Sequence, residues 1–214
     1  MPLPVLTDAL WFPPVEKAEA DGLLAYGGDL RTERLLLAYR SGIFPWFNND
    51  EPPLWWCPDP RCVIFPDELY ISKSMQQLLK RKAFSVTVNR NFAAVIQQCA
   101  ATREEQEGTW ITSGIEEAYT ELHRLGYAVS IEAWQHDELV GGLYGIRIGN
   151  IFFGESMFSK VSNASKYAFI TYVQQLKKEG VVLVDCQIHT PHLESLGARM
   201  IPREEFLKIV KQNI

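Results

Sequence analysis

The sequence predicts an α+β protein with two domains: a small, loop-rich N-terminal domain over residues 1–62, and a larger domain over residues 63–214 with a mixed, mostly antiparallel sheet. Three observations predict this class. Ten of the twelve prolines lie at or before Pro66, and Pro and Gly disfavour long helices and central strands. After that point regular helix and strand patterns follow one another. Two strand patterns are joined by Gly149-Asn150, a turn typical of an antiparallel hairpin.

The elements follow from the apolar periodicity and from the residues that begin and end helices. The N-terminal domain is predicted to contain a single helix, with Thr32 as its N-cap and Gly42 at its end. In the larger domain we expect helices over residues 72–82, 91–100, 113–125 and 163–179 and from Pro202 onward, and strands over 85–89, 128–134, 138–148, 151–157 and 181–188. The hairpin, the long helix and the last strand are consecutive, so the helix should cross over between strands of one sheet.

Charge is distributed unevenly along the chain. The net charge of −5 by itself speaks against a polyanion partner, because nucleic-acid-binding proteins are usually basic. However, residues 61–90 form a basic island, whose cationic members are Arg61, Lys73, Lys80, Arg81, Lys82 and Arg90. This island predicts a localised, salt-sensitive contact with a polyanion.

The sequence shows no signal peptide, membrane span or disulfide motif. The first twenty residues lack a basic head followed by an apolar run, and no apolar stretch approaches the roughly 18 residues of a membrane span. The four cysteines contain no C-x-x-C pair. We therefore expect a cytoplasmic protein with reduced thiols and no membrane contact.

The order of a central hairpin, a helix and a further strand resembles the GNAT acyltransferase architecture. An enzyme of that kind binds the pyrophosphate of acyl-CoA at a glycine-rich turn before the helix, where the backbone approaches the phosphates closely. Here the turn, residues 162–166, reads SNASK and contains no glycine. If the fold is GNAT-like, the acyl donor is expected not to be CoA.

Nine short strings occur in a fixed order along the chain. They are DGLLAYGGDL (21–30), GIFPWF (42–47), WWCPDPR (55–61), GTWIT (108–112), LVGGLYG (139–145), FFGESMFS (152–159), NASK (163–166), DCQ (185–187) and HLESLGA (192–198). Together they resemble the bacterial leucyl/phenylalanyl-tRNA–protein transferases, from about Leu6 to Phe206. The resemblance implies that Leu or Phe, less readily Met, moves from aminoacyl-tRNA to the α-amine of proteins beginning with Arg or Lys. The product is a degradation signal of the N-degron pathway. The expected partners are aminoacyl-tRNA and such proteins, with no cofactor and a monomeric chain.

Asp185 and Gln187 are the first catalytic candidates. They lie two apart on a predicted strand, so they should project from one face while Cys186 points to the other. A carboxylate there can bind a cationic N-terminus and take its proton, and an amide can orient the amine or the ester. The resemblance also implies a catalytic role for both. The alternative is that Asp185 only ends a buried strand and caps the next turn.

Glu155 is the third catalytic candidate, because it follows Gly154 among apolar neighbours. Such a carboxyl group must find a partner or hold a raised pKa. By resemblance it contacts the aminoacyl ester or the terminal adenosine. The alternative is a structural Glu paired with an Arg.

Substrate-binding candidates complete the expected site. For the 3′ end of the tRNA they are Trp46, Trp110, Asn163 and Ser165, the tryptophans because aromatic faces stack on single-stranded RNA bases. For the amino-acid pocket they are Leu143, Phe153, Phe169 and Tyr172, and for the tRNA backbone Lys73, Lys80, Arg81, Lys82 and Arg90. The aromatic and apolar candidates could equally be core residues. Cys186, His189 and His192 are spaced like metal ligands, but the intervening Pro191 and the alternation of a strand speak against a metal site.

Two other functions stay open at this point. One is a GNAT-type N-acyltransferase that uses acyl-CoA, which the glycine-free turn disfavours. The other is a non-catalytic RNA-binding adaptor, which would keep the basic island and the aromatic residues but would not need the Asp185/Gln187 pair.

Overall fold

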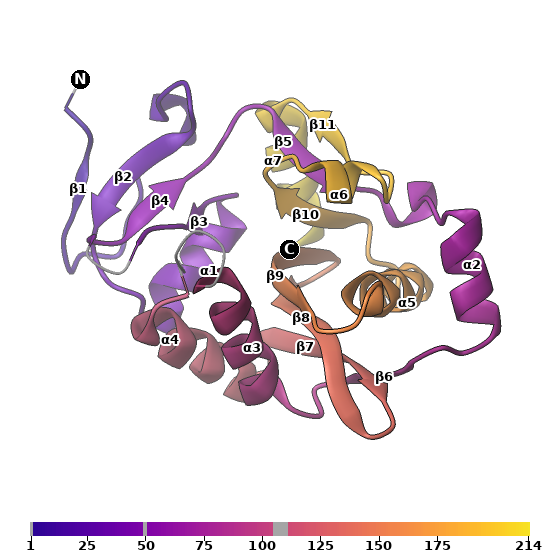
Figure 1. Cartoon of the computed structure of the whole chain (residues 1–214). Coiled ribbons are helices and arrows are strands. Elements are labelled where there is room, and N and C mark those ends of the chain that lie inside the picture. The colour runs from indigo at the N-terminus through magenta and orange to yellow at the C-terminus, as the bar shows by residue number, and fades with distance from the viewer. Residues whose placement is uncertain (1, 49–50, 105–110) are drawn as a thin grey trace.

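The chain folds around two β-sheets (Figure 1). The structure is a computed structural model, which describes residues 2–48, 51–104 and 111–214. The smaller sheet has the order β1-β2-β4-β3 and the larger β11-β5-β10-β9-β8-β7-β6. The strands are β1 (Val5–Leu6), β2 (Leu23–Gly27), β3 (Phe44–Pro45), β4 (Leu54–Trp56), β5 (Arg61–Ile64), β6 (Ser85–Val88), β7 (Ala128–Gln135), β8 (Glu138–Ile148), β9 (Ile151–Ser159), β10 (Leu183–Gln187) and β11 (Arg199–Ile201). The helices are α1 (Thr32–Arg40), α2 (Lys73–Lys80), α3 (Phe92–Glu104), α4 (Ser113–Arg124), α5 (Ala164–Lys178), α6 (Pro191–Glu194) and α7 (Arg203–Asn213), with 3-10 turns η1 (Val15–Lys17) and η2 (Pro66–Glu68).

The predicted α+β class is confirmed, and so is each helix and strand predicted beyond residue 72, within a few residues at the ends. The predicted N-cap of α1 is wrong by one position. Thr32 is the first helical residue, and Arg31 occupies the N-cap without a side-chain cap. The reason is local, because the Arg31 N–H donates to Asp29 Oδ1 at 3.0 Å, which fixes the chain one residue earlier. Gly42 ends this region with φ +73°, and a Cβ there would lie 2.6 Å from Leu207.

The larger sheet separates two hydrophobic cores. Its paired strands are antiparallel except β9 and β10, which are parallel and joined by the crossover helix α5, as the hairpin-helix-strand order predicts. Figure 1 shows α5 on one side of strands β7–β9, and α3 and α4 on the other. Adjacent residues of β9 take opposite sides, since Phe152 packs with α5 and Phe153 with α3 and α4.

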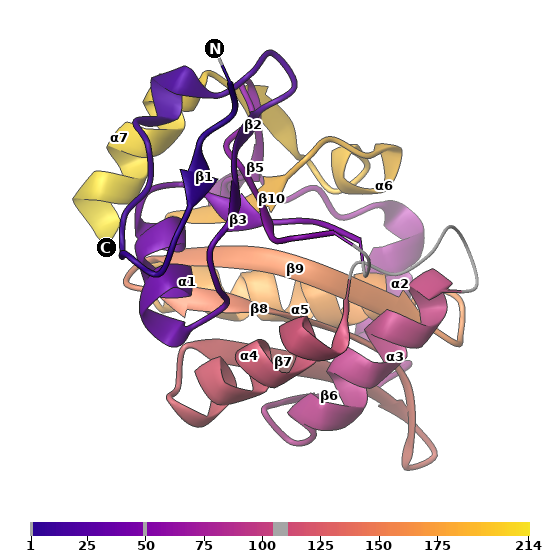
Figure 2. The ribbon, with the colours of Figure 1, turned by 90° about the vertical axis from the view of Figure 1, so that its left-hand side faces the viewer.

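The N-terminal strands and α1 pack onto the core on the α3/α4 side. Leu24, Leu35 and Trp55 belong to the same buried cluster as Phe153, and Figure 2 shows α1 and the N-terminal strands above α3 and α4, on the same side of the larger sheet. Along the chain, β4 is the last strand of the smaller sheet, and the next strand, β5, pairs with β10 in the larger sheet. The boundary expected at residues 62 and 63 therefore falls within β5.

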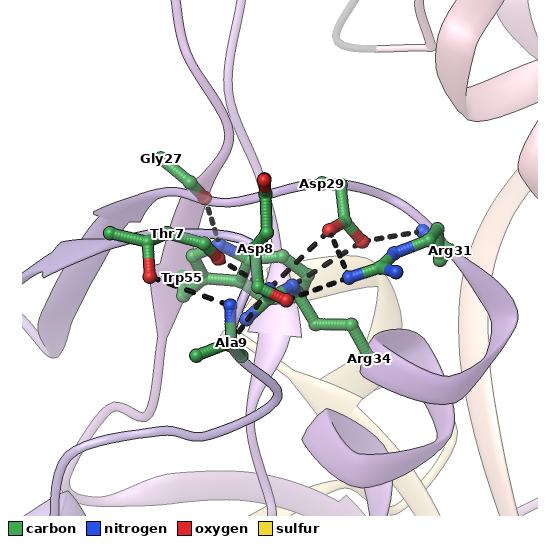
Figure 3. A network of polar contacts seen from close by, with 8 residues as sticks. All are labelled: Thr7, Asp8, Ala9, Gly27, Asp29, Arg31, Arg34 and Trp55. Atoms are coloured by element: carbon green, nitrogen blue, oxygen red, sulfur yellow. Dashed lines mark hydrogen bonds and ion pairs between the residues drawn. The ribbon is translucent and has the colours of Figure 1, made fainter.

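Arg34 holds the N-terminal segment against α1 (Figure 3). Its guanidinium is buried and donates to the carbonyls of Thr7 and Ala9 at 2.6 and 3.0 Å. Its partner carboxylate is Asp29. Burial acts to raise the pKa of Asp29, but hydrogen bonds from Arg31 and Arg34 outweigh it and lower the pKa to about 2. This network lies outside the cleft described next and serves to fix the chain.

Candidate active site

A cleft opens where β9 and β10 part. Their parallel pairing joins Ile151–Phe153 to Leu183–Asp185 and stops there. Beyond that point the two strands form opposite walls of a cavity of about 920 Å³. The loop after α1, the start of α5 and the segment around α6 close its remaining sides. The open end of a parallel pair is a place where a substrate can reach backbone and side chains of both strands.

The side chain of Glu155 lines this cleft, and β9 has a β-bulge at this residue. Tyr144 pairs with Ser156 and Gly145 with Gly154, so Glu155 is an extra residue in β9. A bulge redirects the side chain of its extra residue. The carboxyl group of Glu155 consequently hydrogen-bonds with two hydroxyl groups: Tyr39 Oη lies 2.7 Å from Oε1 and Tyr119 Oη lies 3.2 Å from Oε2.

Burial raises the pKa of Glu155 to about 8, against the opposing effect of the two tyrosine hydrogen bonds. At pH 7 this group is mostly protonated. Burial also raises the pKa of Tyr39 and Tyr119, whose hydroxyls hydrogen-bond each other as well. The expectation of a partner or a raised pKa is met in both respects, and the partners are two tyrosines rather than an arginine. Among the described residues no ion pair involves Glu155.

Asp185 lies beneath the cleft in a buried ion pair. Arg61 donates to it twice, from Nε to Oδ1 at 2.8 Å and from Nη2 to Oδ2 at 2.7 Å, and both side chains are at most 1% exposed. Oδ1 also accepts the N–H of Gln187 at 3.0 Å. Arg61 must therefore be removed from the basic island, because its charge is neutralised inside the protein and cannot face a polyanion.

The strand changes conformation at Gln187. Cys186 packs with the core on the α5 side, opposite the Asp185–Arg61 pair, as strand alternation predicts. Gln187 then has φ +58°, and the N–H of Ile188 donates to the Cys186 carbonyl at 2.7 Å, closing a three-residue turn. A non-glycine residue in this region costs about 1–2 kcal/mol, which the Asp185 contact offsets. Cys186 and Gln187 both line the cleft and Asp185 lies below it, so the expected common face of Asp185 and Gln187 is not found, because a bulge and the positive φ break the alternation after Asp185. Among the described residues Gln187 Nε2 has no hydrogen-bond partner.

Three of the residues expected to bind the tRNA 3′ end line the cleft. Trp46 is 42% exposed, with its ring packed on Trp56 at a centroid distance of 5.6 Å. Asn163 is the left-handed N-cap residue of α5. Ser165 accepts a hydrogen bond from the Ser159 hydroxyl at 2.9 Å. Trp110 lies outside the described residues.

The expected amino-acid pocket is brought together only in part. Leu143 and Phe169 line the cleft. Phe153 and Tyr172 are not among the described residues that line it. Both rings are buried in the core instead, where Phe153 packs on Tyr39 and Tyr172 packs against Phe152. The apolar wall instead includes residues that the sequence did not single out, namely Met157, Val184, Ile188 and Leu193.

The basic residues lie on the surface, apart from the cleft. Lys73, Lys80, Arg81, Lys82 and Arg90 are all exposed, at α2 and at the two ends of β6. Across the described ranges of the chain none of them has an ion-pair partner or lines the cleft. Arg90 stacks on Trp134 at 4.5 Å from the ring centroid. This surface can meet a polyanion that extends beyond the cleft.

Tyr39, Tyr119 and Arg61 were missed as site residues. The tyrosines lie at apolar positions of two helices, and nothing in the local pattern distinguishes them from core residues. Within residues 2–48, 51–104 and 111–214, no cluster of three or more His, Cys, Asp or Glu could hold a metal ion, and no helix is long and apolar enough to cross a membrane.

Comparisons with known protein families and with related sequences point to the same family over most of the chain. The family described as leucyl/phenylalanyl-tRNA protein transferase matches residues 63–211, and its N-terminal domain matches residues 28–59. A leucyl/phenylalanyl-tRNA–protein transferase of Flavobacterium johnsoniae is 61% identical over 94% of this chain and 96% of its own, and one of Pseudomonas fluorescens strain Pf0-1 is 54% identical over 97% and 92%. The structure of an N-acetyltransferase from Thermoplasma acidophilum with coenzyme A is 10% identical, with a TM-score of 0.34 over 45% of this chain and 75% of that one. That likeness is too weak to carry an argument.

Proposed function

Since this chain belongs to the leucyl/phenylalanyl-tRNA–protein transferase family, we propose that it joins Leu or Phe, carried as an ester on tRNA, to the α-amine of proteins that begin with Arg or Lys. The chain is an aminoacyltransferase, and its substrates are an aminoacyl-tRNA and a protein. The choice of a cationic first residue, a weaker use of Met, a monomeric state and action in the cytoplasm all belong to the proposal. The four free cysteines support a reducing compartment.

The reaction needs alignment more than activation. An aminoacyl ester already has a good leaving group, so the protein has to bring the amine to the ester carbonyl and stabilise the tetrahedral oxyanion. The α-amine has a pKa of about 7.7–8.0, and keeping it neutral at pH 7 costs only about 1 kcal/mol. The single observation that carries the proposal is the cleft itself, which combines an apolar wall with two polar groups, Glu155 and Gln187, at the point where β9 and β10 part.

We assign roles to the polar groups from their contacts. The side-chain amide of Gln187 lines the cleft and can orient the incoming amine, with its carbonyl oxygen as acceptor, or the oxyanion, with Nε2 as donor. Asp185, neutralised by Arg61, holds the backbone of this residue by accepting the Gln187 N–H. Glu155 is mostly protonated at pH 7, and when its hydroxyl turns from the tyrosines to the cleft it can donate a hydrogen bond to the developing oxyanion or to the departing ribose oxygen.

Other residues would bind the parts of the aminoacyl-tRNA that do not react, namely the terminal adenine, the Leu or Phe side chain and the body of the tRNA. We propose that the terminal adenine stacks on Trp46 and that the Leu or Phe side chain lies against Leu143, Phe169 and Met157. A hydrophobic pocket separates side chains by only about 1–3 kcal/mol per methylene, which supports tolerance of Met. The exposed cations at α2 and β6 would hold the body of the tRNA.

One experiment decides between this function and its alternatives. The chain is incubated with labelled Leu-tRNA, acetyl-CoA and peptides that begin with Arg, Lys or Ala. Label on the Arg and Lys peptides, but not on the Ala peptide, is the expected result. Consumption of acetyl-CoA with the label left on tRNA would favour a CoA-dependent acyltransferase, and tRNA binding without turnover would favour an RNA-binding adaptor.

A further inference from the structure

The side chain of Arg61 is buried, and it contacts two aromatic rings in addition to the carboxylate of Asp185. Its guanidinium lies over two aromatic rings, 4.7 Å from the centroid of Phe44 and 4.6 Å from that of Phe206. Phe44 belongs to β3 of the smaller sheet and Phe206 to α7, so three separate elements meet at this one side chain. Both rings restrict the movement of the guanidinium.

The fixed guanidinium in turn fixes the carboxylate. Both oxygens of Asp185 accept from Arg61, at 2.8 and 2.7 Å, in the two-pronged geometry that only arginine provides. With both oxygens held, Oδ1 points at the N–H of Gln187 at 3.0 Å. The carboxylate therefore has one orientation, and that orientation is the one that meets the next turn of the chain.

The turn needs such support, because Gln187 is in a left-handed conformation that L-residues other than glycine seldom adopt. Two hydrogen bonds within the turn support it, from the Gln187 N–H to Asp185 and from the Ile188 N–H to the Cys186 carbonyl, beside the pairing of Gln187 with Cys62 of β5 across a bulge. If the carboxylate could rotate, the chain would relax towards the extended conformation and the Gln187 amide would move out of its place in the cleft.

We propose that Arg61 is a positioning residue for aminoacyl transfer: by clamping Asp185 it holds the strained turn that places the Gln187 amide at the reacting groups. This inference rests on the proposed function. It also links the packing of β3 and α7 to catalysis, since their two rings hold the guanidinium. A merely structural ion pair would affect the stability of the fold but not the rate of the folded enzyme.

The test compares Arg61→Lys with Arg34→Lys. Arg34 is equally buried but is paired with Asp29 instead of Asp185, so it undergoes the same chemical change away from the Gln187 turn. Folding is checked by circular dichroism and thermal unfolding, and kcat and KM are measured below the unfolding temperature with Leu-tRNA and a peptide beginning with Arg. Lysine keeps the charge but loses the fork and the stacking.

We expect kcat of Arg61→Lys to fall on the order of 100-fold, the effect of a displacement of about 1 Å in an aligned reaction, with KM for Leu-tRNA within about three-fold. Arg34→Lys should lose thermal stability and keep kcat within about three-fold. A folded Arg61→Lys protein with kcat within about three-fold of the wild type, or with a change in KM alone, would overturn the proposal.

If Arg61→Lys does not fold, a second pair of variants decides. Phe206→Leu removes one ring from the guanidinium without touching the charge, and Phe84→Leu makes the same change in a buried ring that packs on Tyr167. We expect kcat of Phe206→Leu to be lower than kcat of Phe84→Leu by at least about five-fold. Equal kcat values for the two variants would overturn the positioning role. A wild-type chain without transfer would instead refute the proposed function, a distinct outcome from an active wild type with an unaffected Arg61 variant.

Discussion

The pKa of Glu155 makes a measurable prediction about stability against pH. Burial raises this pKa to about 8 from a usual value of 4.5. Between these two values the folded protein keeps a proton that the unfolded chain releases, so the unfolded state is favoured increasingly as pH rises. The contribution of Glu155 to stability is thus fully present below pH 4.5, is lost as pH rises towards 8, and is constant above that. Replacing Glu155 with Gln removes the titration while retaining, as in the protonated acid, an acceptor for one tyrosine hydroxyl and a donor to the other.

The size of the effect follows from the same two values. At about 1.4 kcal/mol per pH unit, the separation between 4.5 and about 8 corresponds to about 5 kcal/mol, of which about 4 kcal/mol falls between pH 5 and pH 9. Glu155 lies at the wall of a cleft that water can enter, and water reduces such differences. We therefore expect the free energy of unfolding of Glu155→Gln, relative to wild type, to increase by about 2–4 kcal/mol from pH 5 to pH 9.

The assay is urea-induced unfolding of both proteins at pH 5, 7 and 9, followed by tryptophan fluorescence and circular dichroism. Other titrating groups are common to the two proteins, so their contributions cancel in the difference at each pH. Equal slopes against denaturant would show that the two proteins expose the same surface on unfolding. A difference that stays within about 0.5 kcal/mol across the range, or that changes in the opposite direction, would refute the reasoning that burial holds the proton on Glu155.

Three further predictions concern the reaction and the tRNA. Asp185→Asn should lower kcat and leave the Kd for tRNA within about two-fold, because an amide has one acceptor oxygen and cannot accept both Arg61 donors while also holding the Gln187 N–H; a change in Kd alone, measured by filter binding, would contradict this. Trp46→Ala should raise KM for aminoacyl-tRNA by about 5- to 150-fold, from the loss of about 1–3 kcal/mol of stacking, and an unchanged KM would remove Trp46 from the adenine site. Replacing Lys80, Arg81 and Lys82 by Ala should reduce the slope of log K against log salt by about 2–3. An unchanged slope would place the tRNA elsewhere.

Much of the fold could be predicted because its signals are local. Gly149-Asn150 specifies a tight turn whatever the rest of the chain does, and the apolar run from Val181 follows a long helix, so a crossover to a buried strand was predictable. The short strands of the N-terminal region were not, because β1 and β3 have two residues each and form only by pairing with β2 and β4. A two-residue strand has no period to detect.

The candidate site could be predicted as a set of residues but not as an arrangement. Glu155 and Gln187 were found because a polar residue in an apolar string is visible in the sequence. The bulge that turns Glu155 towards Tyr39 depends on how β8 and β9 pair across the hairpin. Likewise, Arg61 looked like a member of a basic surface, since the 124 residues that separate it from Asp185 in the chain conceal the ion pair.

By itself the sequence determined the class of fold, the crossover of α5, the family resemblance and a set of polar candidates for the reaction, because periodicity, turns and motifs are properties of neighbouring residues. The tertiary structure alone decided what those residues face. Phe153 and Tyr172 turn away from the cleft, Arg61 is withdrawn from the surface, and Tyr39 joins Glu155. The physical reason is that burial and partner choice depend on contacts between strands and helices distant in the chain, and these contacts set the charge state of each buried group.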